Sequence, residues 1–169
     1  MTISKVLLAA PRGFCAGVDR AIDIVNRAVE ILDQTVYVKH EVVHNKHVIK
    51  DLIDKGVTFV ESLDDVPSGS ILIYSAHGVS KEVSNQAKSK NLKVFDATCP
   101  LVTKVHFEIH KYASENIDVV LIGHSGHPEV EGTMGQYISD HGQIHLVETL
   151  DDIDQLNINS DKIAYVTQT

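Results

Sequence analysis

The feature that most restricts the fold of this chain is an alternation of short apolar runs with segments of helical periodicity. The apolar runs are rich in Val, Ile and Leu along their whole length, which is typical of strands buried on both faces of a parallel sheet. We predict eight such strands. Their sequences are KVLLAA (5–10), TVYVK (35–39), VTFVE (57–61), ILIYSA (71–76), KVFDA (93–97), VVLIGH (119–124), IHLVE (144–148) and KIAYVT (162–167).

Helical periodicity lies between the apolar runs. Residues 17–34 carry apolar side chains three or four positions apart, and residues 48–55 and 101–113 show a similar spacing. The alternation predicts an α/β fold in which parallel sheets are flanked by helices. The strand pattern restarts near Cys99, so we divide the chain into a first α/β unit at residues 1–99 and a second, incomplete unit at residues 100–169.

Charge and composition exclude several classes of function. The 169-residue chain has a formal net charge of −8 and a pI near 5.6, whereas binding to nucleic acid or to anionic membranes requires a basic surface. No apolar stretch is long enough to span a bilayer, and the N-terminal apolar run is too short for a signal peptide. We therefore predict a cytoplasmic protein whose two cysteines stay reduced and act as ligands or reactive groups rather than as a disulfide.

Cysteines and histidines follow the predicted strands at the points where the strands end. The carboxyl ends of parallel strands meet at one edge of a sheet, and the crevice at that edge is the usual ligand site of open α/β folds. We therefore predict that five side chains, distant in sequence, share one cleft. They are Cys15, His44, His77, Cys99 and His127.

The two cysteines each stand at the start of a predicted helix, and Pro100 suits the first helical position after Cys99. The partial positive charge at a helix N-terminus favours a thiolate, which is the form that binds metals and attacks electrophiles. Other interpretations stay open on this evidence. A cysteine in an apolar α/β chain is often a small buried hydrophobe, and Cys15 and Cys99 with two histidines would make a zinc set, although the close paired spacing of structural zinc motifs is absent.

The histidine segments carry further signals. Gly78 frees the backbone after His77, and the next residues predict a turn into a helix capped by Ser80, a geometry that suits phosphate oxygens. Glu129 follows His127 by two residues at another helix start, where a carboxylate is either a general acid or simply a complement to the helix dipole. Six other histidines are interpreted as surface or hydrogen-bonded core residues: His40, His47, His106, His110, His141 and His145.

Six motifs carry a resemblance to a known family. They are PRGFCAGVDRAI, VYVKHEVVHN, SAHGVS, VFDATCPLVTKVH, GHPEVEGTMGQ and the terminal VTQT. In this order, between residues 3 and 169, they resemble the N-terminal portion of the LytB-type 4-hydroxy-3-methylbut-2-enyl diphosphate reductases. The resemblance implies a trefoil-like reductase of three α/β units, of which this chain supplies two, with the strand at residues 5–10 pairing in the third unit.

The resemblance also implies a role for each site residue. Cys15 and Cys99 match two of the three cysteines that hold a 4Fe-4S cluster. Four residues match substrate-pocket positions: His44 and His77 at the diphosphate, His127 lining the pocket, and Thr169 at the substrate oxygen. Glu129 matches the acid of the proton relay. The implied reaction is a two-electron reductive dehydroxylation that yields isopentenyl and dimethylallyl diphosphates, with electrons from a ferredoxin- or flavodoxin-like donor.

The chain departs from the family pattern because it stops at Thr169, before the third cysteine and a serine and asparagine cluster of the diphosphate site. It is either a fragment of a longer enzyme or a shortened protein, and the alternative function is a non-enzymatic diphosphate-binding or assembly fragment. We expect the 169 residues alone to be inactive. We also expect an exposed apolar face that associates with the missing C-terminal portion or with a second copy.

Overall fold

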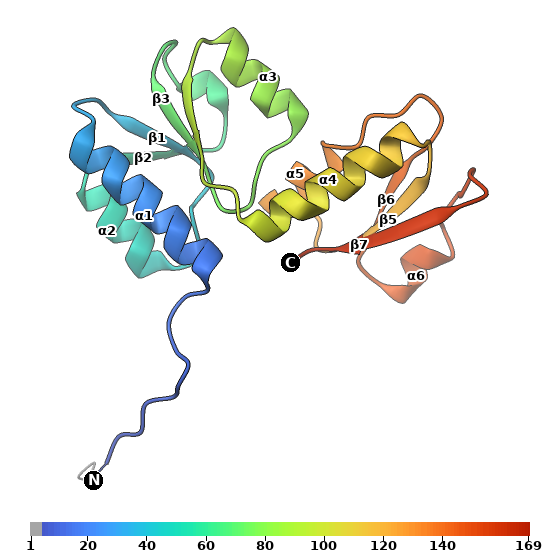
Figure 1. The fold of residues 1–169 in the computed structure, drawn as a ribbon, viewed down its shortest axis with the longest axis horizontal. Helices are drawn as coiled ribbons and strands as arrows, with labels where there is room; N and C mark the ends of the chain where they lie inside the picture. Colours follow the sequence, from blue (N-terminus) through green and yellow to red (C-terminus); the bar gives the residue numbers. More distant parts are fainter. Residues whose placement is uncertain (1–4) are drawn as a thin grey trace.

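The computed structural model describes residues 5–169 and contains two parallel sheets (Figure 1). The first sheet has the strand order β2-β1-β3-β4, and the second has the order β6-β5-β7. Every described strand pairing is parallel. The strands are β1 (Val36–Lys39), β2 (Val57–Val60), β3 (Ile71–Tyr74), β4 (Lys93–Asp96), β5 (Asp118–Ile122), β6 (Ile144–Val147) and β7 (Ile163–Thr167). The α/β fold predicted from the sequence is confirmed.

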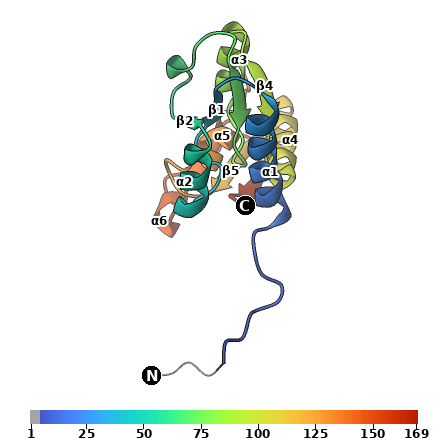
Figure 2. The same cartoon turned by 90° about the vertical axis from the view of Figure 1, so that its left-hand side faces the viewer.

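Helices cover both faces of the first sheet, with α1 and α2 together on one side and α3 on the other (Figures 1 and 2). The helices are α1 (Ala16–Ile31), α2 (Lys46–Asp54), α3 (Lys81–Ser89), α4 (Pro100–Ser114), α5 (Pro128–Met134) and α6 (Leu150–Ile153), with a short 3-10 helix at Leu63–Asp65. Between residues 5 and 169, no helix combines the length and hydropathy needed to cross a bilayer.

Burial on both faces explains the continuous apolar runs of the inner strands. Val38 and Ile73 pack in one cluster with α1 and α2, whereas Leu72 and Tyr74 pack in a second cluster with α3. Successive strand side chains point to opposite faces, so both faces need apolar residues. Strand β4 differs, because it is at the edge of its sheet and all of its residues are exposed. The prediction of a strand there is confirmed, but the expected burial on both faces is wrong for it.

The first predicted strand is absent. Residues 5–15 form neither helix nor strand and extend away from α1 (Figure 1). The side chains of Val6, Leu7 and Leu8 are 72%, 80% and 70% exposed. An extended segment becomes a strand only when a neighbouring backbone pairs with it, and no described strand does so here. Cys15 therefore reaches the site as the residue that caps α1 and not from the end of a strand.

The two sheets divide the chain near the predicted boundary. Strands before Pro100 belong to the first sheet and strands after it belong to the second. The division into two α/β units, residues 1–99 and 100–169, remains a proposal. Residues 1–4 of the first unit lie outside the described residues. The two halves are in contact where the segment after α5 meets the loop before α3. There the side-chain amide of Gln136 donates to the carbonyl of Val79 at 2.6 Å.

A buried carboxylate holds the second sheet to its loops. The Asp118 carboxylate accepts backbone N–H bonds from Gln143, Asn159 and Ser160 at 2.8, 2.6 and 3.1 Å. Burial alone would raise the pKa of Asp118, but the three N–H donors outweigh it and hold the pKa below its usual value of 3.8. The carboxylate therefore stabilises the fold only when it is ionised.

We expect Asp118→Asn to lower the free energy of unfolding by about 3 kcal/mol, because the amide NH₂ faces backbone donors. The contribution of Asp118 is fully present above pH 3.8 and is lost as the pH falls below that value. Urea unfolding at pH 7 and pH 3 measures both effects. The exposed Asp161→Asn is the control and should change stability by less than about 0.5 kcal/mol. Equal losses of unfolding free energy in the two variants would contradict the stabilising role of the Asp118 carboxylate.

Candidate functional site

One cavity of about 300 Å³ gathers six of the seven residues predicted for the site. Its lining comes from the loops that follow the carboxyl ends of β1, β3 and β4, from the starts of α1, α4 and α5, and from Thr169. The C-terminus of the chain lies between the two halves (Figure 1). The seventh residue, His127, lies beside the ring of His44. The cavity is lined by Cys15, Val18, Val42, Val43, His44, Ala76, His77, Cys99, Leu101, Val102, Glu129 and Thr169.

The two thiols face each other across the first turn of α1. Cys15 caps α1 and Cys99 caps α4, and neither thiol is used as a side-chain cap. An added Cβ on Gly17 would stand 2.6 Å from the sulfur of Cys99 and 3.9 Å from that of Cys15. The distance between the two sulfurs therefore cannot exceed the sum of these two distances. Both thiols are free, as the sequence predicts for a disulfide-free protein.

An arginine of α1 fixes the loop that carries Cys99. The Arg20 guanidinium donates to the carbonyls of Thr98 and Asp96 at 3.1 and 3.4 Å. The backbone N–H of Cys99 donates to the carbonyl of Ala76 at 2.9 Å, which ties the same loop to the segment after β3. The two thiols are thus held by contacts between elements that are far apart in sequence.

The three histidines form a compact cluster beside the thiols. Ring centroids lie 4.9 Å apart for His44 and His77, 5.1 Å for His44 and His127, and 5.3 Å for His77 and His127. The Nε2 atoms of His44 and His127 are 3.1 Å apart. One ring nitrogen from each residue lies within 4.8 Å of the others, a spacing that could suit either a metal ion or an anion.

The hydrogen bonding of His127 favours an anion over a metal ion. Its Nδ1 accepts the backbone N–H of Glu129 at 3.1 Å, because it caps α5. A neutral His127 therefore carries its proton on Nε2, the atom that faces His44. A metal ligand normally donates from the nitrogen opposite the metal, which Nδ1 of His127 cannot do while it accepts this bond. The Nε2–H donates to Nε2 of His44 in this structure, and a bound anion would compete for it.

Burial lowers the pKa of two of the three rings. It lowers the pKa of His77 to about 4, with further lowering from the charges of His44 and His127. The pKa of His127 is also lowered, chiefly by burial and next by His44, although the nearby Glu129 raises it. The unliganded His77 and His127 rings are thus neutral near pH 7, and a bound anion would favour their protonated forms.

Glu129 is the buried acid of the site. Its side chain is 7% exposed, and its Oε1 accepts the backbone N–H and the hydroxyl of Thr169 at 2.6 and 2.8 Å. These two bonds hold the carboxyl group against the cavity wall. The sequence indicated Glu129 only through its position at a helix start, and the contact with Thr169 has no signal in the sequence.

A buried lysine was missed by the sequence analysis. Lys39 ends β1 with only 5% of its surface exposed, and its Nζ contacts the ring of His40, which also contacts Glu61. Burial lowers the pKa of Lys39, and Glu61 opposes this. The interpretation of His40 as a hydrogen-bonded core residue agrees with these contacts. A lysine at the end of an apolar strand is the one signal that could have indicated this buried cation.

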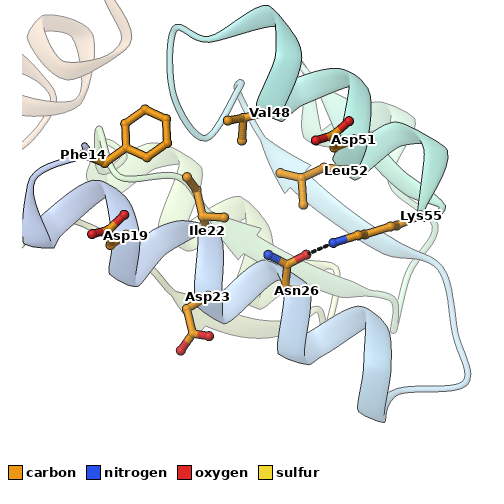
Figure 3. Close-up of a pocket in the computed structure, with 9 residues that line it drawn as sticks. All are labelled: Phe14, Asp19, Ile22, Asp23, Asn26, Val48, Asp51, Leu52 and Lys55. Carbon is orange, nitrogen blue, oxygen red and sulfur yellow. Dashed lines mark hydrogen bonds between the residues drawn. The ribbon is translucent and has the colours of Figure 1, made fainter. Parts of the chain in front are cut away.

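A second hollow of about 340 Å³ lies between α1 and α2 (Figure 3). Ile22, Val48 and Leu52 point into it from the two helices, and the Lys55 ammonium donates to the Asn26 side chain at 2.6 Å at one end. It contains none of the residues predicted for the site. It brings together no thiol or imidazole.

These features define a class of protein: a parallel α/β fold with thiols, imidazoles and a carboxyl group around one ligand cavity at the strand ends. The model of the LytB protein family matches residues 6–169, and the chain belongs to this family.

Relatives of known name agree with this membership. The chain is 58% identical over 166 residues to a 4-hydroxy-3-methylbut-2-enyl diphosphate reductase of Methylococcus capsulatus, covering 98% of this chain and 53% of the relative. It is 61% identical over 167 residues to the reductase of that name from Acinetobacter baylyi, and the match covers 98% of this chain and 53% of the relative. The chain thus spans about half the length of the curated relatives it matches.

Two solved structures share the fold. The E-1-hydroxy-2-methyl-but-2-enyl-4-diphosphate reductase of Plasmodium falciparum superposes with a TM-score of 0.88 at 48% identity, covering 95% of this chain and 50% of that one. A structure of (E)-4-hydroxy-3-methyl-but-2-enyl diphosphate reductase superposes with a TM-score of 0.81 at 34% identity, covering 97% of this chain and 58% of that one.

Proposed function

We propose that this chain forms the thiol and histidine portion of a 4-hydroxy-3-methylbut-2-enyl diphosphate reductase. The reaction is a reductive dehydroxylation that yields isopentenyl and dimethylallyl diphosphates. The observation that carries the proposal is the meeting of Cys15, Cys99, the histidine cluster and Glu129 at one cavity. Membership of the LytB family supports it, because the matched relatives carry the reductase name.

The histidine cluster is proposed to bind the diphosphate. His127 carries an N–H on the nitrogen that faces His44, and an approaching anion would favour the protonated forms of His77 and His127. The buried surroundings strengthen each charge-assisted hydrogen bond once water is excluded. The apolar wall made by Val42, Val43 and Val102 suits the isoprenoid carbons of the substrate.

Cys15 and Cys99 are proposed to hold an iron–sulfur cluster of the 4Fe-4S type. Two thiols that converge on Gly17 fit such a group, because iron–sulfur clusters require thiolate ligands. A side chain at position 17 would fill the space between them. The cluster would supply electrons and an iron that acts as a Lewis acid, and its third cysteine ligand would come from outside these 169 residues.

Glu129 is proposed to be the general acid. Two electrons and two protons convert the allylic alcohol to product: one proton leaves with the hydroxyl as water, and the other adds to the allylic carbon. The Glu129 carboxyl faces the same cavity as the histidines, and Thr169 fixes its orientation. The thiols and the acid thus line the same cavity.

The remaining assignments follow from this chemistry. A low-potential donor of the ferredoxin or flavodoxin kind is proposed to supply the electrons, and free thiols favour the reducing cytoplasm. A non-enzymatic diphosphate-binding fragment is the second candidate. It is favoured by the presence of the complete histidine cluster beside only two cysteines.

Diphosphate binding should be accompanied by proton uptake. The free pKa of His77 is about 4, and an anion raises it, so protons are taken up between pH 4 and the pKa of the complex. The contribution of His77 to affinity is then lost as the pH rises through the pKa of the complex. Calorimetric titration of inorganic diphosphate at pH 6, in two buffers of different ionisation enthalpy, measures the uptake.

We expect His77→Asn to weaken diphosphate binding about tenfold and to abolish most of the proton uptake, because one charge-assisted hydrogen bond is worth about 1.5 kcal/mol. His47→Asn is the matched control, since His47 is exposed on α2 and lies outside the cavity. If His77→Asn took up as many protons as the parent chain, or if the two variants behaved alike, the anion assignment of the cluster would be wrong.

A further inference from the structure

The turn after His77 is packed between two helices of the second half of the chain, α4 and α5. Gly78 has a φ of +75°, and an added Cβ there would stand 2.8 Å from Cε1 of His106 and 3.4 Å from Val102, both on α4. On the other side, an added Cβ on Gly132 of α5 would lie 3.4 Å from the carbonyl of Gly78. The turn that carries His77 is therefore in contact with α4 and α5 at once.

The imidazole of His106 packs against Gly78 in this turn. The buried Nε2 of His106 has no hydrogen-bond partner among residues 5–169. From the sequence, His106 is expected to be a surface or hydrogen-bonded core residue, but its buried Nε2 makes no hydrogen bond to any described residue. Burial lowers the pKa of His106 to about 4, and His110 lowers it further while Asp96 opposes this, so the ring is neutral near pH 7. A buried polar atom without a partner is destabilising. What the ring provides here is a flat surface against Gly78.

We propose that His106 is a positioning residue for the anion site: its ring holds the Gly78 turn so that His77 faces the cavity. The inference rests on the proposed function, because it takes His77 as a diphosphate ligand. Outside the histidine cluster, the described hydrogen bond of the His77 side chain joins its Nδ1 to the Ser75 hydroxyl at 3.3 Å. With the ring of His106 removed, the glycine at position 78 is free to sample other conformations. Ordering the turn then opposes binding.

The test is a double-mutant cycle on the 169-residue chain, with inorganic diphosphate as the probe and calorimetry or phosphorus NMR as the readout. We expect His106→Ala to weaken binding about fivefold in the parent chain and by less than 1.5-fold in a His77→Ala background, because His106 acts through His77. His106→Phe should restore binding to within about twofold of the parent, since a flat ring is all that the role requires and the removed nitrogen has no partner.

The matched control is His145→Ala, which removes the other imidazole whose buried Nε2 has no described partner, on β6 of the second sheet. It should lower the melting temperature without changing diphosphate affinity. If His106→Ala does not fold, His106→Leu replaces it, with the same expected pattern at a smaller magnitude. An equal loss in both backgrounds, or no loss in either, would overturn the inference. If His77→Ala itself left affinity unchanged, the diphosphate assignment would fail first, and this inference with it.

Discussion

A protein that consists of these 169 residues alone is expected to show no reductase turnover above background, even after anaerobic treatment with iron and sulfide. Cys15 and Cys99 are the only thiols in the sequence, and a cluster short of one protein ligand is labile and open to solvent. The loss should exceed a thousandfold relative to a full-length relative. The measurement is consumption of the allylic diphosphate with dithionite as the reductant.

The control for this experiment is an extended protein, made of residues 1–169 joined to the C-terminal half of the Acinetobacter baylyi relative, which is 61% identical over the shared part. Extension should restore both tight iron binding and turnover. Turnover by the 169-residue protein at a rate similar to the extended protein would contradict the account, and would mean that a second copy supplies the third thiolate.

In the extended protein, Glu129→Gln is expected to lower kcat by at least a hundredfold while KM changes by less than about threefold. The amide keeps the shape of the side chain and can accept the bonds from Thr169, but it has no acidic proton to give. Steady-state kinetics with saturating reductant separates the two parameters.

The matched control is Glu131→Gln, two residues along the same helix, where the side chain is exposed and lies outside the cavity. It removes the same charge at nearly the same place and should leave kcat within about twofold. A rise in KM with unchanged kcat in Glu129→Gln would assign Glu129 to binding, and the proton-donor role would be wrong.

Local signals in the sequence were sufficient to place most of the site. The apolar runs define where β3 and β4 of the first sheet and β5 of the second end, so His77, Cys99 and His127 could be predicted to share one cleft, although the structure draws them from two sheets rather than one. Pro100 and Ser80 likewise marked the starts of α4 and α3, and the structure has both helices there. These predictions succeeded because strand and helix periodicity are properties of short segments.

Features that depend on contacts between distant segments were not predictable in this way. The run at residues 5–10 has the composition of a strand, but pairing needs a neighbouring backbone that no described strand provides. The approach of Cys99 to Gly17 and the packing of His106 on Gly78 join residues more than 25 positions apart. Nothing in either local sequence indicates the partner, so His106 was interpreted as an ordinary histidine.

The central claim is that an allylic diphosphate binds beside iron held by Cys15 and Cys99, and Mössbauer spectroscopy of the extended protein loaded with ⁵⁷Fe tests it most directly. The account predicts that adding the allylic diphosphate changes the isomer shift of a minority of the iron, because an iron left without a protein ligand would be free to act as a Lewis acid on the substrate oxygen. It also predicts that Cys99→Ser removes most of the bound iron. An iron spectrum that stays the same when the diphosphate is bound, or iron that is retained at parent levels without Cys99, would contradict the account.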